Sequence, residues 1–431
     1  MRNVFVALIV LLLIVKSVFA QDEIIWQKGV SHLGVCNKAL LSPKGDISAN
    51  TLNKFIQLRD ANGNELSTLD GHDELVTDIV FSADGNFLFS GAGNIDFPEY
   101  IASIIQWNVN DYNLESAFEP DIPENYFYVE SIDVSSDGNL LAGLFIARTQ
   151  TLGKFDRTIF IWNNESAEIL AKFSFEGNNH ISKVKFSNDK LFFNLDEKMA
   201  MIETNNFTLV EKLGENQNWH NIPISDFDIS GDSKYISSID LEGNCKLFNL
   251  EDDTISLSFI PISEGTLLNQ VLFGKDDDYL IFINSLLNNM AIYNLKQMEL
   301  YHLFTQHSSA LEYISLNQQK DKALLTDKDN LYYINLTYEK TIDIKEEPSS
   351  NTFEIFPNPV IDEFKLTLTD NFTSEFDYKI LNYLGQEVLS GNCINENDMT
   401  INVAGLTAGY YSILVYNTNI SLSRSFIKIA K

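Results

Sequence analysis

The stretch of sequence that decides the fold begins at Asp70-Gly71-His72 and ends at Trp107-Asn108. Between these ends, the alternating segment Val76–Phe81 leads to the turn Ser82-Ala83-Asp84-Gly85, and Phe87-Leu88-Phe89-Ser90-Gly91 follows. An Asp-Gly pair supplies the positive φ that a tight hairpin needs. The stretch therefore predicts short antiparallel β-strands joined by tight turns.

The same plan recurs along the chain in two columns of residues. The first column is the residue that opens the Asp-Gly turn: Leu41, Phe81, Val134, Phe186, Ile229, Phe273 and Leu316. The second is a Trp-like position near the end of each copy: Leu58, Trp107, Trp162, Ile202, Phe248, Tyr293 and Ile334. Seven β-rich copies of about 46 residues each predict a radial stack of four-stranded sheets, a seven-bladed β-propeller. We expect this propeller to span residues 21–344.

At Asp70-Gly71-His72 and Trp107-Asn108 the chain resembles the WD-repeat family, which has this fold. The resemblance implies that His72 hydrogen-bonds within its blade, to Ser90 and Trp107, and it gives Trp162 the corresponding structural place in the next copy. His32, His72, His220 and His307 each lie nine residues before their turn-opening residue. A histidine that recurs with the blade period is expected to be structural rather than catalytic.

A propeller ring must be closed, because an open stack of blades leaves unpaired sheet edges. The strand-like segment Glu23-Ile24-Ile25-Trp26 lies outside the seven copies. We expect it to pair with the last blade beside residues 331–335.

The first 20 residues are typical of a cleaved secretory signal. Arg2 precedes twelve consecutive apolar residues, Val4 to Val15, and Ala20 ends a small-residue cleavage site. Twelve residues at ~1.5 Å each are too short to span a ~30 Å hydrocarbon core. We expect the mature protein to be exported and to have no stable membrane span after the signal is removed.

Charge and cysteine content exclude several classes of function. The 431 residues include 60 acidic and 30 basic side chains, for a formal net charge of −30. Nucleic acids and anionic lipid surfaces are bound by Lys and Arg, so neither is an expected partner. Cys36, Cys245 and Cys393 are scattered and lack CxxC spacing, which argues against a disulfide framework or a cysteine zinc site.

The C-terminal region follows a different plan. Residues 345–350 are charged and rich in Pro and Ser, which predicts a linker. Alternating strands in residues 351–431 predict a small β-sandwich. This region carries three motifs in order: Phe356-Pro357-Asn358-Pro359, then Leu384-Gly385-Gln386-Glu387-Val388, then Gly405-Leu406-Thr407-Ala408-Gly409-Tyr410-Tyr411.

Together the three motifs resemble the C-terminal sorting domain of the type IX secretion system of Bacteroidetes. The residues that match its motifs are Pro357, Asn358, Pro359, Gly385, Gly405, Gly409 and Tyr411. The resemblance implies contact with the type IX secretion machinery and passage through the periplasm to the outer-membrane surface or the medium.

Signatures of catalysis are missing from the sequence. It has no HExxH, no GxSxG, and no phosphate-binding or dinucleotide-binding glycine pattern. Asp276-Asp277-Asp278 occupies a turn position, where a solvated hairpin is expected and where three adjacent aspartates lack the alternate spacing of a calcium loop. We expect no cofactor, no metal and no catalytic residue.

Two insertions predict a ligand-binding rim instead. The second and third copies are lengthened at residues 94–103 and 147–157, and the link between them, residues 119–130, is long and aromatic. Aromatic and arginine side chains dominate contact energies in interfaces. The candidate ligand-binding residues are Phe97, Tyr100, Tyr126, Tyr128, Arg148, Phe155 and Arg157, with Trp219 from a loop expected on the same face.

The sequence thus favours a secreted or cell-surface, non-catalytic propeller that binds an extracellular protein or a glycan. Two alternatives stay open. The first is an extracellular propeller hydrolase or lyase acting on polysaccharide, since carboxylates are plentiful. The second is a structural scaffold in a surface assembly, with the insertions merely covering the rim.

Overall fold

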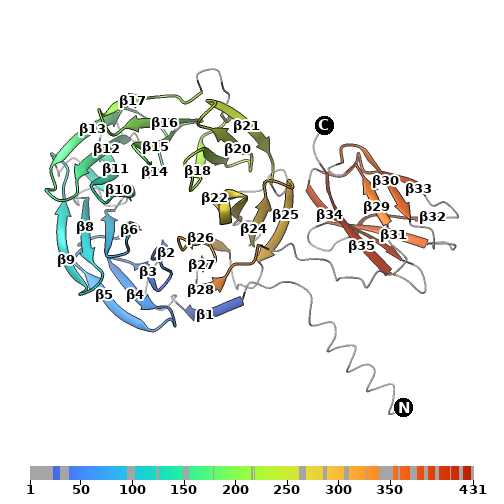
Figure 1. The fold of residues 1–431 in the computed structure, drawn as a ribbon, viewed down its shortest axis with the longest axis horizontal. Helices are drawn as coiled ribbons and strands as arrows, with labels where there is room; N and C mark the ends of the chain where they lie inside the picture. The colour runs from blue at the N-terminus through green and yellow to red at the C-terminus, as the bar shows by residue number, and fades with distance from the viewer. Residues whose placement is uncertain are drawn as a thin grey trace, which may run out of the picture. The chain divides into compact units, whose positions relative to one another are not determined.

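Each copy of the repeat forms one four-stranded antiparallel sheet in the computed structural model, and the seven sheets form a ring (Figure 1). The first strand of each blade lies nearest the centre of the ring and the fourth lies at its outer edge. The structure describes residues 23–29, 38–94, 102–122, 126–148, 155–177, 179–214, 217, 219–261, 268–284, 289–304, 310–327, 329–338, 353–357, 360–368, 376–382, 387–393, 398–407, 409–416 and 421–428. The predicted signal, with its cleavage residue Ala20, and the predicted linker lie outside these residues.

The strands of the propeller follow the repeat in order. Blades 1 to 3 contain β2 (Ala39–Leu41), β3 (Ile47–Leu52), β4 (Phe55–Asp60), β5 (Glu65–Asp70), β6 (Val76–Phe81), β7 (Phe87–Ala92), β8 (Ser103–Asn108), β9 (Asn113–Phe118), β10 (Tyr126–Val134), β11 (Leu140–Arg148), β12 (Phe155–Asn163) and β13 (Ile169–Phe175). Blades 4 and 5 contain β14 (Val184–Ser187), β15 (Lys190–Leu195), β16 (Lys198–Glu203), β17 (Thr208–Val210), β18 (Ile224–Ile229), β19 (Tyr235–Asp240), β20 (Cys245–Asn249) and β21 (Thr254–Phe259). Blades 6 and 7 contain β22 (Leu268–Phe273), β23 (Tyr279–Asn284), β24 (Asn289–Asn294), β25 (Glu299–Phe304), β26 (Leu311–Leu316), β27 (Lys322–Asp327) and β28 (Asn330–Asn335), completed by β1 (Glu23–Gly29).

The Asp-Gly turns form as the sequence predicts. Gly85 and Gly138 have φ of 75° and 74°, the left-handed region in which glycine is not strained. In blade 2 the Ser82 hydroxyl donates to Asp84 at 2.6 Å, which orders the five-residue connection between β6 and β7. Blade 6 has a short 3₁₀ turn instead, η2 (Lys275–Asp277). Blade 4 has only the two-residue turn Asn188-Asp189 between β14 and β15.

The predicted closure of the ring is confirmed. Strand β1 pairs antiparallel with β28, from Glu23 opposite Asn335 to Gly29 opposite Asn330. Trp26 is 9% exposed, and its indole N–H donates to the carbonyl of Ala61 in blade 1 at 3.1 Å. Its ring packs on Tyr333, with 5.4 Å between ring centroids. The N-terminal strand therefore joins the last blade to the first and leaves no open edge there.

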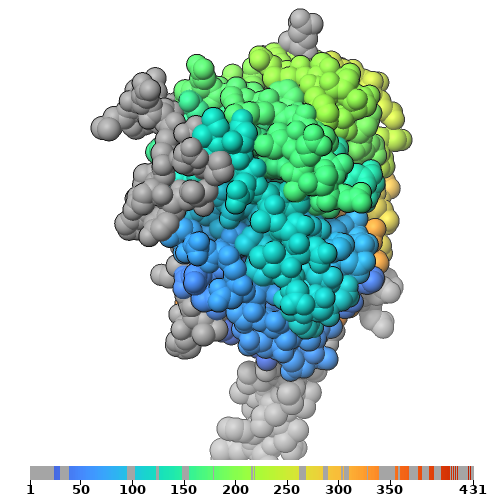
Figure 2. Space-filling view, turned by 90° about the vertical axis from the view of Figure 1, so that its left-hand side faces the viewer, coloured from blue at the N-terminus to red at the C-terminus, as the bar shows by residue number. Residues whose placement is uncertain are grey.

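Apolar side chains between neighbouring sheets form the propeller core. The cluster at the boundary of blades 2 and 3 includes Phe89, Phe118, Phe145, Phe160 and Trp162. Figure 2 shows the outer side of blades 1 to 3, which follow one another from blue through cyan to green. In the described parts of the chain, no helix is long and apolar enough to cross a membrane.

The C-terminal strands form a separate compact unit, a small β-sandwich. One sheet contains β29 (Phe353–Phe356), β30 (Glu363–Leu368) and β33 (Asp398–Asn402). The other contains β31 (Phe376–Asn382), β32 (Glu387–Cys393), β34 (Gly409–Tyr416) and β35 (Ser421–Lys428). Phe364 and Leu366 of the first sheet share one core with Ile380, Ile413 and Phe426 of the second.

Candidate functional site

Blade 3 is longer than its neighbours at one end. Strands β10, β11 and β12 have nine residues each, whereas β6, β7 and β8 of blade 2 have six. The register pairs Arg148 with Phe155 and Tyr126 with Ala147. Residues 126–128, 146–148 and 155–157 therefore lie side by side where the insertions begin, and we call these nine residues the blade 3 end.

The blade 3 end presents one exposed aromatic ring on a buried support. Phe155 is 38% exposed and packs on Phe127, which is fully buried, with 5.7 Å between ring centroids. Tyr128 is half-buried, and burial together with the nearby Glu130 carboxylate raises the pKa of its phenol. Both side chains are members of the predicted ligand-binding set, and both are accessible to solvent.

Arg157 is already engaged within the propeller. Its guanidinium donates to the Glu130 carboxylate at 3.2 Å, to the carbonyl of Ile181 at 2.9 Å and to that of Asn179 at 2.9 Å. Burial raises the pKa of Glu130, although the charge of Arg157 acts to lower it. Arg157 therefore ties the blade 3 end to the link that leads into blade 4, and we regard it as a positioning residue.

Two predicted ligand-binding residues are corrected by their burial. Tyr126 is 5% exposed and packs edge-on against Phe145 and Phe160. Trp219 is 2% exposed, stacks on Phe248 with 4.6 Å between centroids, and donates to the carbonyl of Leu213 at 2.9 Å. Both rings complete the blade cores and have no face free for a ligand.

The side chains of three further candidate ligand-binding residues are not among those that the structure describes. Phe97 and Tyr100 lie outside the described residues, and Arg148 is described only as the last backbone position of β11. Their role in ligand binding stays a prediction.

Sequence reasoning missed a ring of polar residues that lie on the innermost strands or immediately before them. Its members lie three residues and one residue before each turn-opening position, and we call them the inner polar ring. The first tier is Lys38, Asp78, Ser131, Lys183, Asp226, Gln270 and Tyr313, and the second tier has polar members only at Asp133, Lys185, Asp228 and Ser315. The spacing was readable in the sequence, but alternating polar residues on a strand usually indicate a solvated face.

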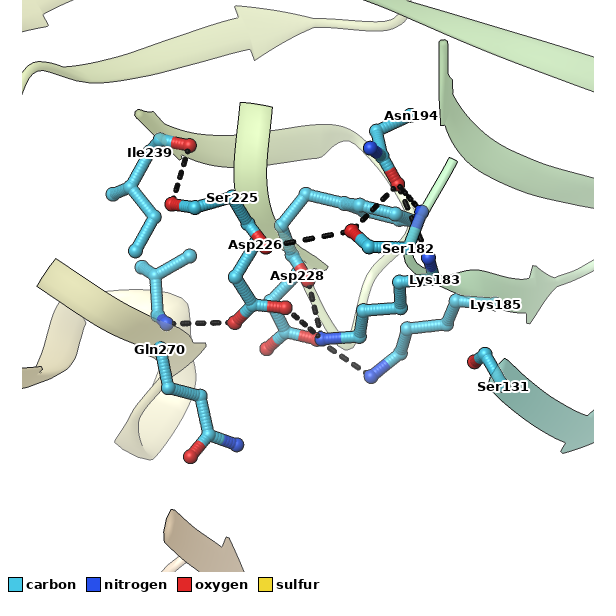
Figure 3. Close-up of polar contacts among 12 residues, drawn as sticks. Ser131, Ser182, Lys183, Lys185, Asn194, Ser225, Asp226, Asp228, Ile239 and Gln270 are labelled. Carbon is cyan, nitrogen blue, oxygen red and sulfur yellow. Dashed lines mark hydrogen bonds and ion pairs between the residues drawn. The ribbon is translucent and has the colours of Figure 1, made fainter. Parts of the chain in front are cut away.

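Figure 3 shows the ring where blades 4, 5 and 6 meet. The Lys183 ammonium donates to Asp226 at 2.7 Å, and the Lys185 ammonium donates to Asp228 at 2.5 Å. The second oxygen of each aspartate accepts a backbone N–H from blade 6, from Val271 at 2.9 Å and from Phe273 at 2.7 Å. The carboxylates of Asp226 and Asp228 in blade 5 therefore each bond to blade 4 on one side and to blade 6 on the other.

Side-chain hydrogen bonds also cross the other blade junctions. Lys38 pairs with Asp78, whose second oxygen accepts the Ile132 N–H at 2.7 Å. Asp133 accepts the Phe186 N–H at 2.6 Å, Gln270 exchanges two bonds with the Ile314 backbone, and Ser315 accepts the Leu41 N–H at 3.1 Å. The inner polar ring thus links all seven blades and fixes their spacing.

The charges of the ring are strongly coupled. Burial raises the pKa of Asp133 to about 6, against the lowering effect of Lys185. Burial acts to lower the pKa of Lys185, but the carboxylates of Asp228 and Asp133 raise it overall. Lys185 therefore stays charged and is shared between blades 3 and 5.

The histidine networks are buried inside blades. His72 Nε2 lies 2.7 Å from the Ser90 hydroxyl, which also accepts the Trp107 indole N–H at 2.7 Å, as the resemblance to WD repeats implies. Burial lowers the pKa of His72 to about 4. In blade 5, His220 contacts Ser238 at 2.9 Å and Asp240 at 2.8 Å. That set has the composition of a hydrolytic triad, but Ser238 is fully buried, so no substrate carbonyl reaches it in this conformation.

Outside the inner polar ring, the carboxylates in the described part of the chain do not form a metal site. Among the described residues, no three His, Cys, Asp or Glu side chains are placed to hold a metal ion. Asp277 of the acidic turn pairs with Lys320 of blade 7 at 2.7 Å and accepts the Asp232 N–H of blade 5 at 3.1 Å. This turn therefore connects three blades.

The sorting motifs lie at strand ends of the sandwich. Pro357 follows β29, Gly405 lies in an exposed turn, and Gly409 begins β34. The Tyr411 hydroxyl donates to the carbonyl of Thr407 at 2.9 Å, and its ring stacks on Phe426. Asn358, Pro359 and Gly385 lie outside the described residues.

Comparison with known families agrees with both parts of the chain. The secretion system C-terminal sorting domain matches residues 354–429, and the WD domain, G-beta repeat, matches residues 63–95. The second match runs through β5, β6 and β7, the part of the repeat with the clearest turn. No curated protein matches the chain.

The fold and these matches define a WD-repeat-like β-propeller protein with a C-terminal sorting domain of the Bacteroidetes type IX secretion system. Its sorting domain directs export through that system to the cell surface or the extracellular space.

Proposed function

We propose that the exported propeller is a non-catalytic binding protein whose blade 3 end contacts an extracellular protein or glycan. The observation that carries this proposal is the exposed Phe155 ring, supported by the buried Phe127. An aromatic side chain held rigid by its neighbour contributes contact area with little loss of side-chain entropy on binding. Arg157 supports this rigidity, because it ties the same end to blade 4 through three hydrogen bonds.

Two features favour binding over hydrolysis. The Ser-His-Asp set of blade 5 is buried, and the carboxylates of the inner polar ring are used in hydrogen bonds between blades. A glycosidase needs two accessible carboxyl groups flanking its substrate. Asp226 and Asp228 are both buried and paired with lysines.

The test is a matched pair of variants on one blade. Phe155 and Leu170 are each 38% exposed, and Leu170 lies on the outermost strand of blade 3. The full-length protein and its F155S and L170S variants are applied to glycan arrays and to an array of the producer's own surface proteins. We expect F155S to lose about tenfold or more in affinity for the ligand found, and L170S to bind as the wild type does.

Equal binding by F155S and the wild type would show that the blade 3 end is not the contact surface. Equal losses in both variants would point to a general effect on the blade. Thermal melts of the two variants separate binding from folding, because both side chains are partly solvated and neither is expected to be needed for stability.

A further inference from the structure

The short turn of blade 4 coincides with a cavity against blade 5. Six blades connect their first two strands through five residues, whereas blade 4 uses only Asn188-Asp189. A cavity of about 240 Å³ lies beside this turn, bounded by Ser187 and Lys190 of blade 4 and by Ser233 of the five-residue connection in blade 5. Ser187 and Ser233 meet there, with their hydroxyl oxygens 2.6 Å apart.

Part of the cavity lining is apolar. The apolar residues are Phe192 and Met201 from blade 4, Leu213 from the link that follows, and Leu250 from blade 5. Phe192 and Leu213 are buried, so their positions are set by the blade core. These four side chains offer apolar contact area to a bound apolar group.

Two acidic residues and one basic residue also line the cavity. Glu251 and Asp253 lie in the turn after β20, and Lys190 is the first residue of β15. Lys190 already has Asp189 within 3.6 Å, and Glu251 is 66% exposed in its side chain with only a loose contact to Lys234 at 3.8 Å. This charge arrangement disfavours anionic lipid headgroups and favours a cationic partner.

We infer that the cavity between blades 4 and 5 is a peptide-binding pocket that accepts one large apolar side chain flanked by Lys or Arg. A volume of about 240 Å³ is below the range of about 300–1,000 Å³ typical of small-molecule sites, and it suits a single anchoring side chain. The flanking cation meets Glu251 and Asp253. This site is separate from the blade 3 end and does not depend on its role.

The inference is tested with short synthetic peptides and the full-length protein. The probes are the acetylated and amidated pentapeptides Ser-Lys-Phe-Lys-Ser, Ser-Glu-Phe-Glu-Ser and Ser-Lys-Ala-Lys-Ser, measured by calorimetry at low salt. We expect saturable binding of the first peptide, and affinities at least about tenfold lower for the other two.

Two variants locate the binding site. L250N introduces into the cavity lining the residue type that blade 3 has at the same repeat position, Asn164, and should lower the affinity for the first peptide by about tenfold. E251Q should lower it by about threefold. The control is E165Q, because Glu165 occupies the same repeat position in blade 3. The Glu165 backbone N–H donates to the Asn163 side chain, just as the Glu251 N–H donates to the Asn249 side chain.

Failure of the wild type to bind the first peptide would overturn the inference. Equal affinity for the Lys-flanked and Glu-flanked peptides would also overturn it, as would equal weakening by E251Q and E165Q. Since Glu251 is exposed, E251Q tests the pocket even if L250N fails to fold. Loss of array binding in F155S with unchanged peptide binding would show that the two surfaces act separately.

Discussion

Blades 3 and 4 are neighbours built on the same repeat, but blade 3 has the longer strands and blade 4 the shorter ones. Blade 3 has strands of nine, nine, nine and seven residues, and blade 4 has strands of four, six, six and three. Blade 3 packs Phe145, Phe160 and Trp162 in its core and contributes Ser131 and Asp133 to the inner polar ring, where blade 4 contributes Lys183 and Lys185. The long blade ends in an exposed aromatic surface, and the short blade leaves a cavity beside its turn.

This difference shows that a propeller tolerates variation at blade ends while its junctions stay linked. The extra residues of blade 3 lie at one end of the sheet, and the missing residues of blade 4 lie in a turn. Neither change touches the positions three residues and one residue before the turn, where Ser131 and Asp133 bond to blade 4 and Lys183 and Lys185 bond to blade 5. In these two blades, the variation in length is therefore confined to the end of a sheet and to a turn.

The largest expected effect is a loss of stability that distinguishes the core of blade 3 from the core of blade 4. W162A removes a fully buried indole that packs on Phe118, Phe145 and Phe160, and should lower the free energy of unfolding by about 3–5 kcal/mol. I202V, at the same repeat position in blade 4, should cost about 0.5–1.5 kcal/mol. Urea denaturation measures both. A smaller loss in W162A than in I202V would contradict the importance of the aromatic core in blade 3.

The next effect tests the charged junction of blade 4. D228A removes the partner of Lys185 and the acceptor of the Phe273 N–H, and should cost about 2–3 kcal/mol. E242A removes an exposed carboxylate from the same blade and should leave the midpoint of unfolding unchanged. If the two variants unfold alike, the pair between blades 4 and 5 does not stabilise the ring.

A smaller effect is a pH dependence at the boundary of the two blades. The pKa of Asp133 is raised to about 6 by burial, so the folded protein binds this proton more tightly than the unfolded chain does. The resulting stabilisation is complete below the ordinary aspartate pKa and is lost as pH rises through about 6. The wild type should therefore lose about 1–2 kcal/mol relative to D133N between pH 4 and pH 7.

The control for this slope is D137N in the same blade. The Ser135 hydroxyl and the Asn139 N–H lower the pKa of Asp137. Its contribution is thus present above the ordinary pKa and is lost as pH falls, with a sign opposite to that of Asp133. Unfolding curves at several pH values should show opposite slopes, and equal slopes would refute the assignment.

The smallest expected effect is the loss of the indole N–H hydrogen bond, which differs between Trp162 of blade 3 and Trp107 of blade 2. Trp162 Nε1 has no hydrogen-bond partner among the described residues, because Gly143 stands where blade 2 has Ser90. Apart from the packing lost with the larger ring, W162F should therefore lower the free energy of unfolding by less than about 1 kcal/mol. W107F should cost about 1–2 kcal/mol, since it breaks the bond to the buried Ser90. Melting both variants side by side checks the difference, and a larger loss in W162F would mean that its N–H has a partner.

Much of the fold was predictable because its signals are local and repeated. The turn-opening and Trp-like columns set the number of blades, and Trp26 beside residues 331–335 gave the closure. The site was less predictable. Tyr126 and Trp219 are aromatic residues in or near loops, and sequence alone does not distinguish a loop ring that faces solvent from one that folds back into a blade. Phe155 and Tyr128 stayed accessible, while Arg157 proved to be used within the propeller.

By itself, the sequence determined the seven repeats, the Asp-Gly turns, the closing strand and the sorting motifs, because each depends on residue types at short spacing. Only the tertiary structure decided which blades share Lys185, why the pKa of Asp133 is raised, and where a cavity remains beside Asn188-Asp189. These properties depend on side chains about 45 positions apart in the sequence, one repeat of this propeller, being brought together across blade junctions. Hydrogen bonds and burial depend on which side chains are close in space, and in this protein the packing of neighbouring blades determines that.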